Sequence, residues 1–363
     1  MKTKTLFTTY LPLRVALVVL MLATVIGASA ATQYATNGIV WDNGITAGWA
    51  SASGGARTAV WTAGNDAVFE TLTGTVNNSN ATAHNITFTV NTFVITNNTI
   101  TLTGLTPTIT CNNSGYADTI GSVIAGSAGL TMAGPGTLTF SGANTYTGPA
   151  ILSLSARVVP AVVGAFGTNS VTVGSGSQVT VNTVSLTNNF TISGTGWTKD
   201  STTSSLRLGA LRIYNNFTVS GAVTLAAAAT IRANGLAGTV GTVSGVIGDG
   251  GSGYALDTGS FLATSTLVLS GANTYSGATT ISGGSLWLNH QLALQNSTLT
   301  MTGLGTLLFS NGVAANPPKV NALPATPLLN NRVPRPVIVN VLFCNANGLF
   351  NQSEPPEIVV APL

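Results

Sequence analysis

The chain has 363 residues, of which 42 are glycine and only 6% are charged, whereas an ordinary globular domain carries about 25% charged residues. Its hydrophobic content of 44% is enough to bury a core, so the low charge does not indicate disorder. Lys2, Lys4 and Arg14 account for the formal net charge of +3, because the other nine Lys and Arg balance nine Asp and Glu. The composition therefore gives no argument for nucleic acid as a partner.

The first 30 residues have the pattern of a secretory signal peptide. The basic residues are followed by an apolar run, 15–27, which is short for a membrane span. A small-residue site then predicts cleavage between Ala30 and Ala31. An uncleaved N-terminal anchor is the alternative. Cleavage implies a secreted chain with no stable membrane insertion of the mature protein.

Residues 31–70 form a segment rich in tryptophan, with Trp41, Trp49 and Trp61 interleaved with Gly and Asn. The end of a stacked repeat array needs a covering segment, and large aromatic side chains suit that purpose. We therefore predict a cap at 31–70. The alternative is an aromatic platform that binds sugars.

From residue 71 to residue 315, short apolar–polar alternations separated by polar turns predict short β-strands. The stretch 188–194 (NNFTISG) recurs as 215–221 (NNFTVSG). Such strands are too short to be stable alone, so we expect them to wind into parallel coils that hydrogen-bond to one another at about 4.8 Å. The segment is long enough for roughly 11–14 coils. Within it, the alanine run 226–229 is predicted as part of a strand pair, with a short helix as the alternative.

The composition changes after residue 315. Residues 316–363 hold nine of the 14 prolines and one of the 42 glycines, and the alternation stops. Proline cannot donate to a strand ladder, so this tail is predicted to lie outside the coils. It has the composition of an extended or disordered Pro-rich segment, or of an assembly or reading-frame artefact.

One motif occurs twice within the predicted coils. Residues 267–281 read LVLSGANTYSGATTI, and residues 138–151 read LTFSGANTYTGPAI. Each copy is predicted to be a strand, a tight turn and a second strand, with Gly and Asn accepting the positive φ that turns require. A corner that recurs in this way indicates a stacked repeat architecture. The corner residues that we single out are Gly142, Asn144, Tyr146, Gly148, Gly271, Asn273, Tyr275 and Gly277.

These corners resemble the autotransporter-associated β-strand repeat of secreted bacterial proteins. The copy at 267–288 matches almost throughout, whereas in the copy at 138–151 Pro149-Ala150 stands in place of two threonines. The resemblance implies an all-β, right-handed parallel β-helix that is exported. It also implies that the chain acts as an autotransporter passenger. Nothing after residue 313 supplies the strands of a membrane barrel, so a truncated passenger without its translocator is one reading.

The few charged residues offer little for a catalytic site. Asp42 with Asp66 or Glu70 is the carboxylate pair with the spacing of one coil, as a polysaccharide lyase or glycosidase would need. His84 and His290 are isolated, and both are predicted to be solvated turn histidines. We predict no catalytic, metal or cofactor site.

Two further features carry no predicted function. Residues 248–253 (GDGGSG) match the spacing of a dinucleotide fingerprint, but no helix is predicted to follow, so a flexible loop is expected. Cys111 and Cys344 lack metal-ligand spacing, and both a disulfide and free thiols remain open.

The sequence therefore predicts a secreted or cell-surface β-helical protein of a bacterium. Its role is expected to be structural or adhesin-like and non-catalytic, with Ser/Thr/Asn-rich faces that bind glycans or surface proteins. A polysaccharide-active β-helix enzyme and the truncated passenger are the alternatives.

Overall fold

The computed structural model describes residues 30–310, except 37, 71–72, 91, 115–116, 198–207, 235–236, 261–263 and 303–304, and the backbone of 340–344. The chain divides into two units, Met1–Ala31 and Thr32–Leu363, and the fold lies in the second. The predicted signal peptide and most of the predicted tail fall outside the described residues.

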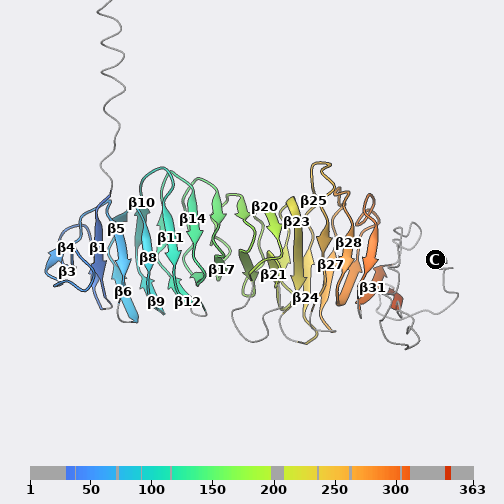
Figure 1. The fold of residues 1–363 in the computed structure, drawn as a ribbon, viewed down its shortest axis with the longest axis horizontal. Helices are drawn as coiled ribbons and strands as arrows, with labels where there is room; N and C mark the ends of the chain where they lie inside the picture. Colours follow the sequence, from blue (N-terminus) through green and yellow to red (C-terminus); the bar gives the residue numbers. More distant parts are fainter. Residues whose placement is uncertain are drawn as a thin grey trace, which may run out of the picture. The chain divides into compact units, whose positions relative to one another are not determined.

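Parallel strands in stacked coils form a β-solenoid of about 11 turns (Figure 1). One ladder runs through it from first to last, each strand pairing in parallel with the strand one coil earlier. Its strands are β1 (Thr32–Ala35), β5 (Asp66–Phe69), β8 (Ile86–Phe88), β11 (Thr108–Cys111), β14 (Leu130–Ala133), β16 (Ala150–Leu152), β18 (Val171–Val173), β20 (Phe190–Gly194), β23 (Val223–Ala233), β26 (Leu256–Asp257), β28 (Thr279–Ile281) and β30 (Leu299–Met301).

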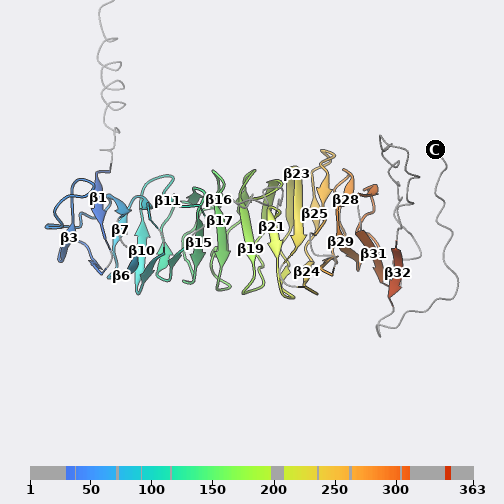
Figure 2. The same ribbon diagram turned by 60° about the horizontal axis from the view of Figure 1, so that its bottom comes forward.

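A second parallel ladder forms another face of the earlier coils. It comprises β2 (Val40–Trp41), β6 (Gly74–Asn78), β9 (Phe93–Thr96), β12 (Ala117–Ile120), β15 (Thr137–Phe140), β17 (Arg157–Pro160), β19 (Gln178–Val181) and β21 (Leu211–Ile213). Two smaller sheets lie beside these ladders (Figure 2). The first has β7 (Thr82–Ala83), β10 (Thr99–Leu102) and β13 (Val123–Ala125); the second has β22 (Thr218–Val219), β24 (Val240–Val243), β27 (Thr266–Leu269), β29 (Gly284–Leu288), β31 (Gly305–Ser310) and β32 (Asn340–Cys344).

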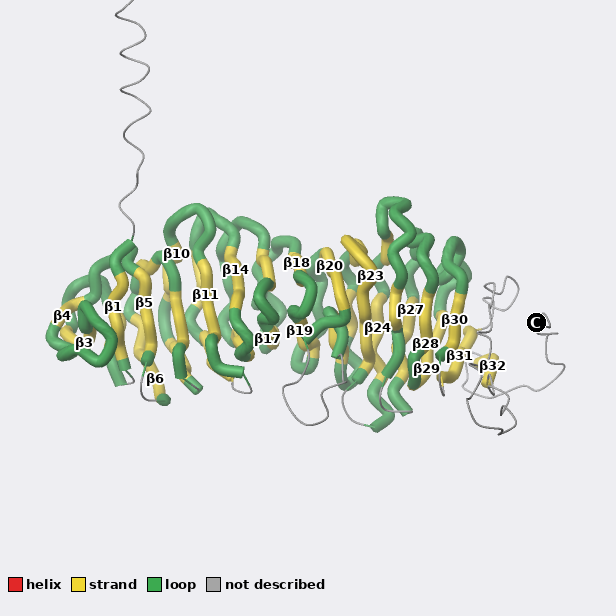
Figure 3. The backbone as a smooth tube through the Cα atoms, viewed as in Figure 1, coloured by secondary structure: helices red, strands yellow, loops and turns green. Residues whose placement is uncertain are grey.

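The alanine run lies in β23, a single strand of 11 residues, and not in a strand pair or a helix. Its first residues pair with β20 in the first ladder and with β25 (Ile247–Gly248). Its last residues pair with β21 in the second ladder. One continuous strand thus runs from the first ladder to the second, and β23 joins the two ladders into one sheet. The described residues contain no helix (Figure 3). Among them there is therefore no helix that is long and apolar enough to cross a membrane.

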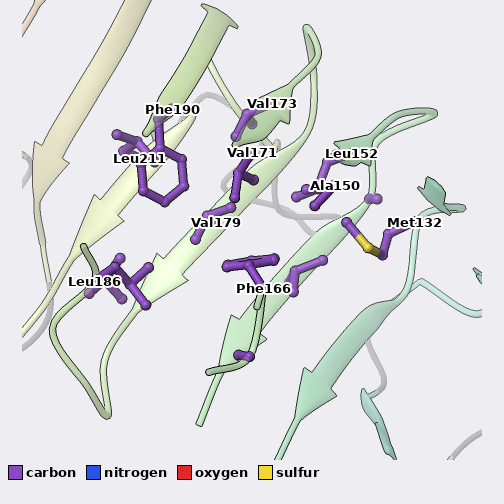
Figure 4. Packing of buried hydrophobic residues seen from close by; sticks show 14 of the residues in the cluster. Met132, Ala150, Leu152, Phe166, Val171, Val173, Val179, Leu186, Phe190 and Leu211 are labelled. Atoms are coloured by element: carbon purple, nitrogen blue, oxygen red, sulfur yellow. The ribbon is translucent and has the colours of Figure 1, made fainter. Parts of the chain in front are cut away.

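The core follows from the period of two in the strands. Alternate residues are buried, as in β31 and β9, and the buried residues of neighbouring coils meet in one hydrophobic cluster. The same register position on β16, β18 and β20 is held by Ala150, Val171 and Phe190. The side chains of these residues lie in the interior of the coils (Figure 4).

The first coils contain an aromatic cluster. Trp41, Trp49 and Trp61 are at most 1% exposed, and their ring centroids lie 4.4–5.7 Å apart. Trp41 also packs edge-on against Phe69 at 5.4 Å. Because these rings are buried, they cannot serve as an aromatic platform for sugars, the alternative that the sequence left open.

An antiparallel segment lies against the first strand. β3 (Ala47–Trp49) pairs with β4 (Ala59–Val60), and just beyond β3 the amide and carbonyl groups of Ala50 bond those of Tyr34 in β1, both at 2.9 Å. The edge of β1 at this position is therefore paired within the chain.

One part of the predicted tail does join the coils. Asn340–Cys344 forms β32, which lies parallel to β31 in the second smaller sheet. The prediction placed all of 316–363 outside the coils, and for these five residues the structure differs. A short apolar run in the tail has the β-propensity that pairing on the last open strand requires.

Close backbone approach limits which residue types the coils accept. A Cβ on Gly271 would lie less than 3.0 Å from the carbonyl oxygen of Gly245; one on Gly245 would meet Gly221 in the same way, and one on Gly221 would meet Asn188. These residues form a column in which the backbone of one coil rests directly on the next. Only glycine leaves room for that contact.

We expect Gly245→Ala to lower the free energy of unfolding by about 3 kcal/mol, because the new methyl group must push two coils apart. Urea titration followed by far-ultraviolet circular dichroism measures this. Gly250→Ala is the matched control, since a Cβ there meets open space, although its φ of +62° adds about 1 kcal/mol of backbone strain. Equal losses in the two variants would contradict the column argument.

Candidate functional site

The corner glycines are required by close approach and not by backbone conformation. None of Gly142, Gly148, Gly271 and Gly277 has a positive φ, so that part of the prediction is wrong. A Cβ on any of them would lie less than 3.0 Å from backbone atoms of the preceding coil. Positive φ occurs instead at the Asn pairs 97–98 and 215–216, which lie just before β10 and β22.

The two corner asparagines each connect three coils. Asn144 is buried; its Oδ1 accepts from the amide of Ile124 at 2.8 Å, and its Nδ2 donates to the carbonyl of Ala165 at 2.6 Å. Asn273 repeats this arrangement with Ile247 and Ala293, at 2.8 and 2.9 Å. An amide with one donor and one acceptor end satisfies the backbone groups below and above it in a single bridge.

The corner tyrosines are also buried, but their hydroxyls differ. Tyr275 Oη lies 2.5 Å from Thr279 Oγ1, which lies 2.8 Å from Ser297 Oγ. In the first copy, Ala150 stands where Thr279 stands in the second, and Tyr146 Oη is buried without a hydrogen-bond partner in the described part of the chain. Burial raises the pKa of both tyrosines. In this alignment Pro149 lies opposite Ala278, so Ala150-Ile151 replaces the two threonines. The loss of the threonine hydroxyl at Ala150 leaves a polar atom unsatisfied but does not prevent β16 from forming.

A groove of about 620 Å³ opens beside the first corner. It crosses successive coils and is lined by residues 144–147, 163–164, 167–170 and 187–189. Asn amides hold its floor together: Asn169 Nδ2 donates to Tyr146 O at 2.7 Å, and Asn188 Nδ2 donates to Asn169 O at 2.9 Å. The lining contains no charged residue, and its exposed members are Thr145, Thr147, Val163, Thr168, Ser170, Thr187 and Asn189.

Sequence reasoning found only one edge of this groove. Residues 163–170 carry no motif, residues 188–189 belong to the recurring NNFT strand, and only the coil register brings both segments beside residues 144–147. The glycine column was also missed beyond Gly271. A recurring Ser-Gly dipeptide at 220–221, 244–245 and 270–271, spaced by about one coil, was the available signal.

The candidate carboxylates are engaged separately. Asp42 accepts from the amides of Ile45 and Thr46 and from the Thr46 hydroxyl. Glu70 accepts from Ser53 Oγ, from Gly54 N and from Arg57 Nη2 at 2.7 Å. Burial of each carboxylate raises its pKa, but these donors outweigh that effect and leave both pKa values below the usual range. Both carboxylates stabilise turns of their own segment.

His84 is not isolated, contrary to the prediction. Its Nδ1 lies 2.8 Å from Oδ1 of Asp66, which also accepts from Asn85 Nδ2 at 2.9 Å. Asp66 and His84 lie on neighbouring coils, a relation that sequence spacing alone did not reveal. His290 Nδ1 accepts from the amide of Leu292 and so belongs to a turn, as expected.

The glycine-rich loop is organised by Asp249. Its carboxylate, 3% exposed as a residue, accepts from the amides of Gly251, Gly253 and Tyr254 within the loop. It also accepts from the amide and hydroxyl of Ser276 at 3.1 and 3.2 Å, which ties the loop to the second repeat corner. The loop is followed by β26 and not by a helix, so it lacks the geometry of a dinucleotide site.

Asp118 and Cys111 form a buried pair of polar groups. Asp118 Oδ1 accepts from the amide of Phe93 at 2.9 Å, and its carboxylate also contacts the Cys111 thiol. Burial raises the pKa of both groups. Cys111 is a free thiol, and the side chain of Cys344 lies outside the described residues. In the part of the chain that the structure describes, no group of three or more His, Cys, Asp or Glu could hold a metal ion.

Comparison with known families matches both corners. The family model of the passenger-associated-transport-repeat matches residues 130–153 and 264–288, which contain all eight corner residues. Searches of the curated proteins and of the solved structures found no significant match.

The fold and the corners define a parallel β-solenoid whose coils carry recurring passenger repeats. The chain thus carries two copies of the passenger-associated-transport-repeat, which together with the β-solenoid supports a repeat protein of the autotransporter passenger type.

We expect Ala150→Thr to raise the free energy of unfolding by about 1 kcal/mol, because the new hydroxyl gives Tyr146 Oη the partner that Thr279 gives Tyr275. Ala150→Val is the matched control: it has nearly the same volume but no hydroxyl. Urea titrations of the two variants separate the hydrogen bond from the added volume. A Val variant as stable as the Thr variant would rule out the hydrogen bond as the cause.

Asp249 predicts a dependence of stability on pH. Burial raises its pKa, but the amides of Ser276, Gly251, Tyr254 and Gly253 outweigh this and leave the pKa below its usual value. A carboxylate with a lowered folded pKa stabilises the fold above its unfolded pKa of about 3.9, and this stabilisation is lost as the pH falls through the folded pKa.

Asp249→Asn removes that titration. We expect the difference in unfolding free energy between the unaltered protein and the variant to be largest near pH 7 and to shrink below about pH 4. Urea titrations at a series of pH values measure it, and other acidic groups cancel because both proteins contain them. A difference that stays constant from neutral to acidic pH would refute the assignment.

Proposed function

We propose that the protein is an exported, adhesin-like β-solenoid that is secreted by a bacterium or displayed on its cell surface. Its role is to bind a partner and not to catalyse a reaction. The family of its two repeats is that of passengers, which supports export. The observation that carries the binding role is the groove beside the first corner, with its uncharged, hydroxyl-rich lining.

The chemistry of the groove favours a neutral glycan. Each exposed threonine hydroxyl donates one hydrogen bond and accepts others, as sugar hydroxyls do. The floor amides are already bonded to backbone carbonyls, so the groove keeps its shape without a ligand. A preformed site loses less entropy when it binds.

The carboxylates support a role without catalysis. Asp42 is held by donors of its own turn, Glu70 by donors of the loop 53–57, and Asp66 by His84 and Asn85. A glycosidase needs two carboxylates facing one cleft at about 5–10 Å, with one of them poised to give up a proton. Lowered pKa values for Asp42 and Glu70 do not suit a general acid.

The test is binding of the purified protein to an array of neutral glycans. The combined variant Thr145→Val, Thr168→Val and Thr187→Val removes three groove hydroxyls with little change in volume, and we expect it to lose at least tenfold in affinity. The matched control is Thr131→Val, Thr172→Val and Thr191→Val, on half-exposed positions of β14, β18 and β20 outside the groove.

Equal affinity of the groove variant and the control variant would overturn the groove as the binding site. The same preparations also test the enzyme alternative when they are incubated with neutral and acidic polysaccharides. Release of reducing ends or unsaturated products that Asp66→Ala abolishes would overturn the non-catalytic proposal.

A further inference from the structure

Three of the four arginines among the described residues lie on one face of the solenoid. Arg157 is on β17, Arg212 on β21 and Arg232 on β23, strands that belong to the second ladder (Figure 2). Arg232 pairs with Asp257 at 2.9 Å, and the fourth, Arg57, pairs with Glu70.

Arg157 and Arg212 differ from the other two. In the ranges that the structure describes, neither forms an ion pair with a carboxylate. Both are half-buried. Two neighbouring half-buried guanidinium groups without an anion are unusual, because burying a charge is unfavourable unless it is paired.

The strand register brings these two side chains together. Thr180 of β19 pairs in register with Arg212, and Nε of Arg157 donates to Thr180 Oγ1 at 3.3 Å. The Arg157 side chain thus extends from β17 to Thr180 on β19. Thr180 lies one coil from Arg212 and at the same register position. Coils are separated by about 4.8 Å.

Both guanidinium groups are held in place by aromatic rings and by a buried polar relay. The Arg157 guanidinium carbon lies 5.1 Å from the Trp197 ring centroid, and that of Arg212 lies 4.4 Å from Tyr214. Thr180 Oγ1 donates to Gln178 Oε1 at 2.9 Å, and Gln178 Nε2 donates to Gly209 O at 2.8 Å.

The terminal nitrogens remain available to a ligand. Arg212 uses its Nε to donate to Asn234 O at 2.9 Å, and Arg157 uses its Nε on Thr180. No nitrogen of either guanidinium is both buried and unbonded. The unbonded terminal nitrogens are therefore not fully enclosed, and they form a pair of oriented forks that suit carboxylate or sulfate oxygens.

The local electrostatics agree with an anion site. Burial lowers the pKa of Arg212 to about 10, Tyr214 counteracts this, and the positive charge of Arg157 lowers the pKa further. A bound anion would offset both the cost of burying the Arg212 charge and its repulsion by Arg157.

We propose that Arg157 and Arg212 form an anion site that binds the carboxylate or sulfate groups of an acidic polysaccharide. The ligand class rests on the proposed glycan-binding function, but the site lies on other residues than the neutral groove. Nucleic acid fits less well, because its affinity depends on many phosphate contacts and the described residues place two unpaired cationic side chains here.

The experiment measures binding of polygalacturonate, dextran sulfate and uncharged dextran to the purified protein by titration calorimetry. We expect the acidic polymers to bind and the combined variant Arg157→Gln and Arg212→Gln to lose at least tenfold in affinity for them. Arg212→Lys keeps the charge but not the fork, and a loss of several-fold is expected. Preference between the two acidic polymers distinguishes carboxylate from sulfate recognition.

Arg57→Gln is the matched control for loss of charge, because Arg57 lies in another segment. A control that loses as much affinity as the combined variant would overturn the site, as would acidic polymers that bind the combined variant unchanged. Binding by Asp200→Asn but not by the unaltered protein would also overturn it, since the anion would then be the chain's own. Circular dichroism of each variant verifies the fold. Neutral-glycan binding in the groove is measured separately, so either proposal can fail alone.

Discussion

The spacing between coils is the constraint on which the rest of the structure depends. Parallel strands pair at about 4.8 Å, and at several turns the backbone of one coil rests on that of the next with no side chain between them. Gly142, Gly148, Gly271 and Gly277 satisfy this at the repeat corners, and Gly221 and Gly245 satisfy it between them. Buried asparagines then join the same coils by hydrogen bonds. In the repeat motif, the glycines thus allow the backbones of neighbouring coils to touch, and the asparagines bond those coils together.

The architecture was predictable because its signals are local. Alternating strands, polar turns and a repeated corner lie within windows of five to fifteen residues, and each indicates the same parallel coil. The corner residues were identified correctly as positions, but the reason assigned to the glycines was wrong. Positive φ is a property of one residue and is suggested by glycine itself, whereas close approach depends on a second segment, such as Gly245 beneath Gly271.

What the sequence did not reveal depends on register between coils of unequal length. Phe190 pairs with Val223 across 33 residues, whereas Val171 pairs with Phe190 across 19. No fixed period therefore places Arg157 beside Arg212, His84 beside Asp66, or residues 187–189 beside the first corner. The unsatisfied Tyr146 hydroxyl has a different cause, because in the second copy the partner of Tyr275 is Thr279, only four residues away. The effect of Ala150 at the matching position is visible only once the ring is known to be buried.

The antiparallel contact between Tyr34 and Ala50 gives the two ends of the solenoid different properties. At the first coil, a strand of opposite direction occupies the backbone groups to which a further parallel strand would bond. At the last described coils, β31 accepts β32 in the parallel direction used throughout. At Tyr34 the edge of β1 therefore lacks the free backbone groups that an added parallel strand would need, whereas β31 bonds a further strand in the direction of the coils. The antiparallel contact protects that part of the edge from edge-to-edge pairing with another chain, which is a hazard of open sheet edges.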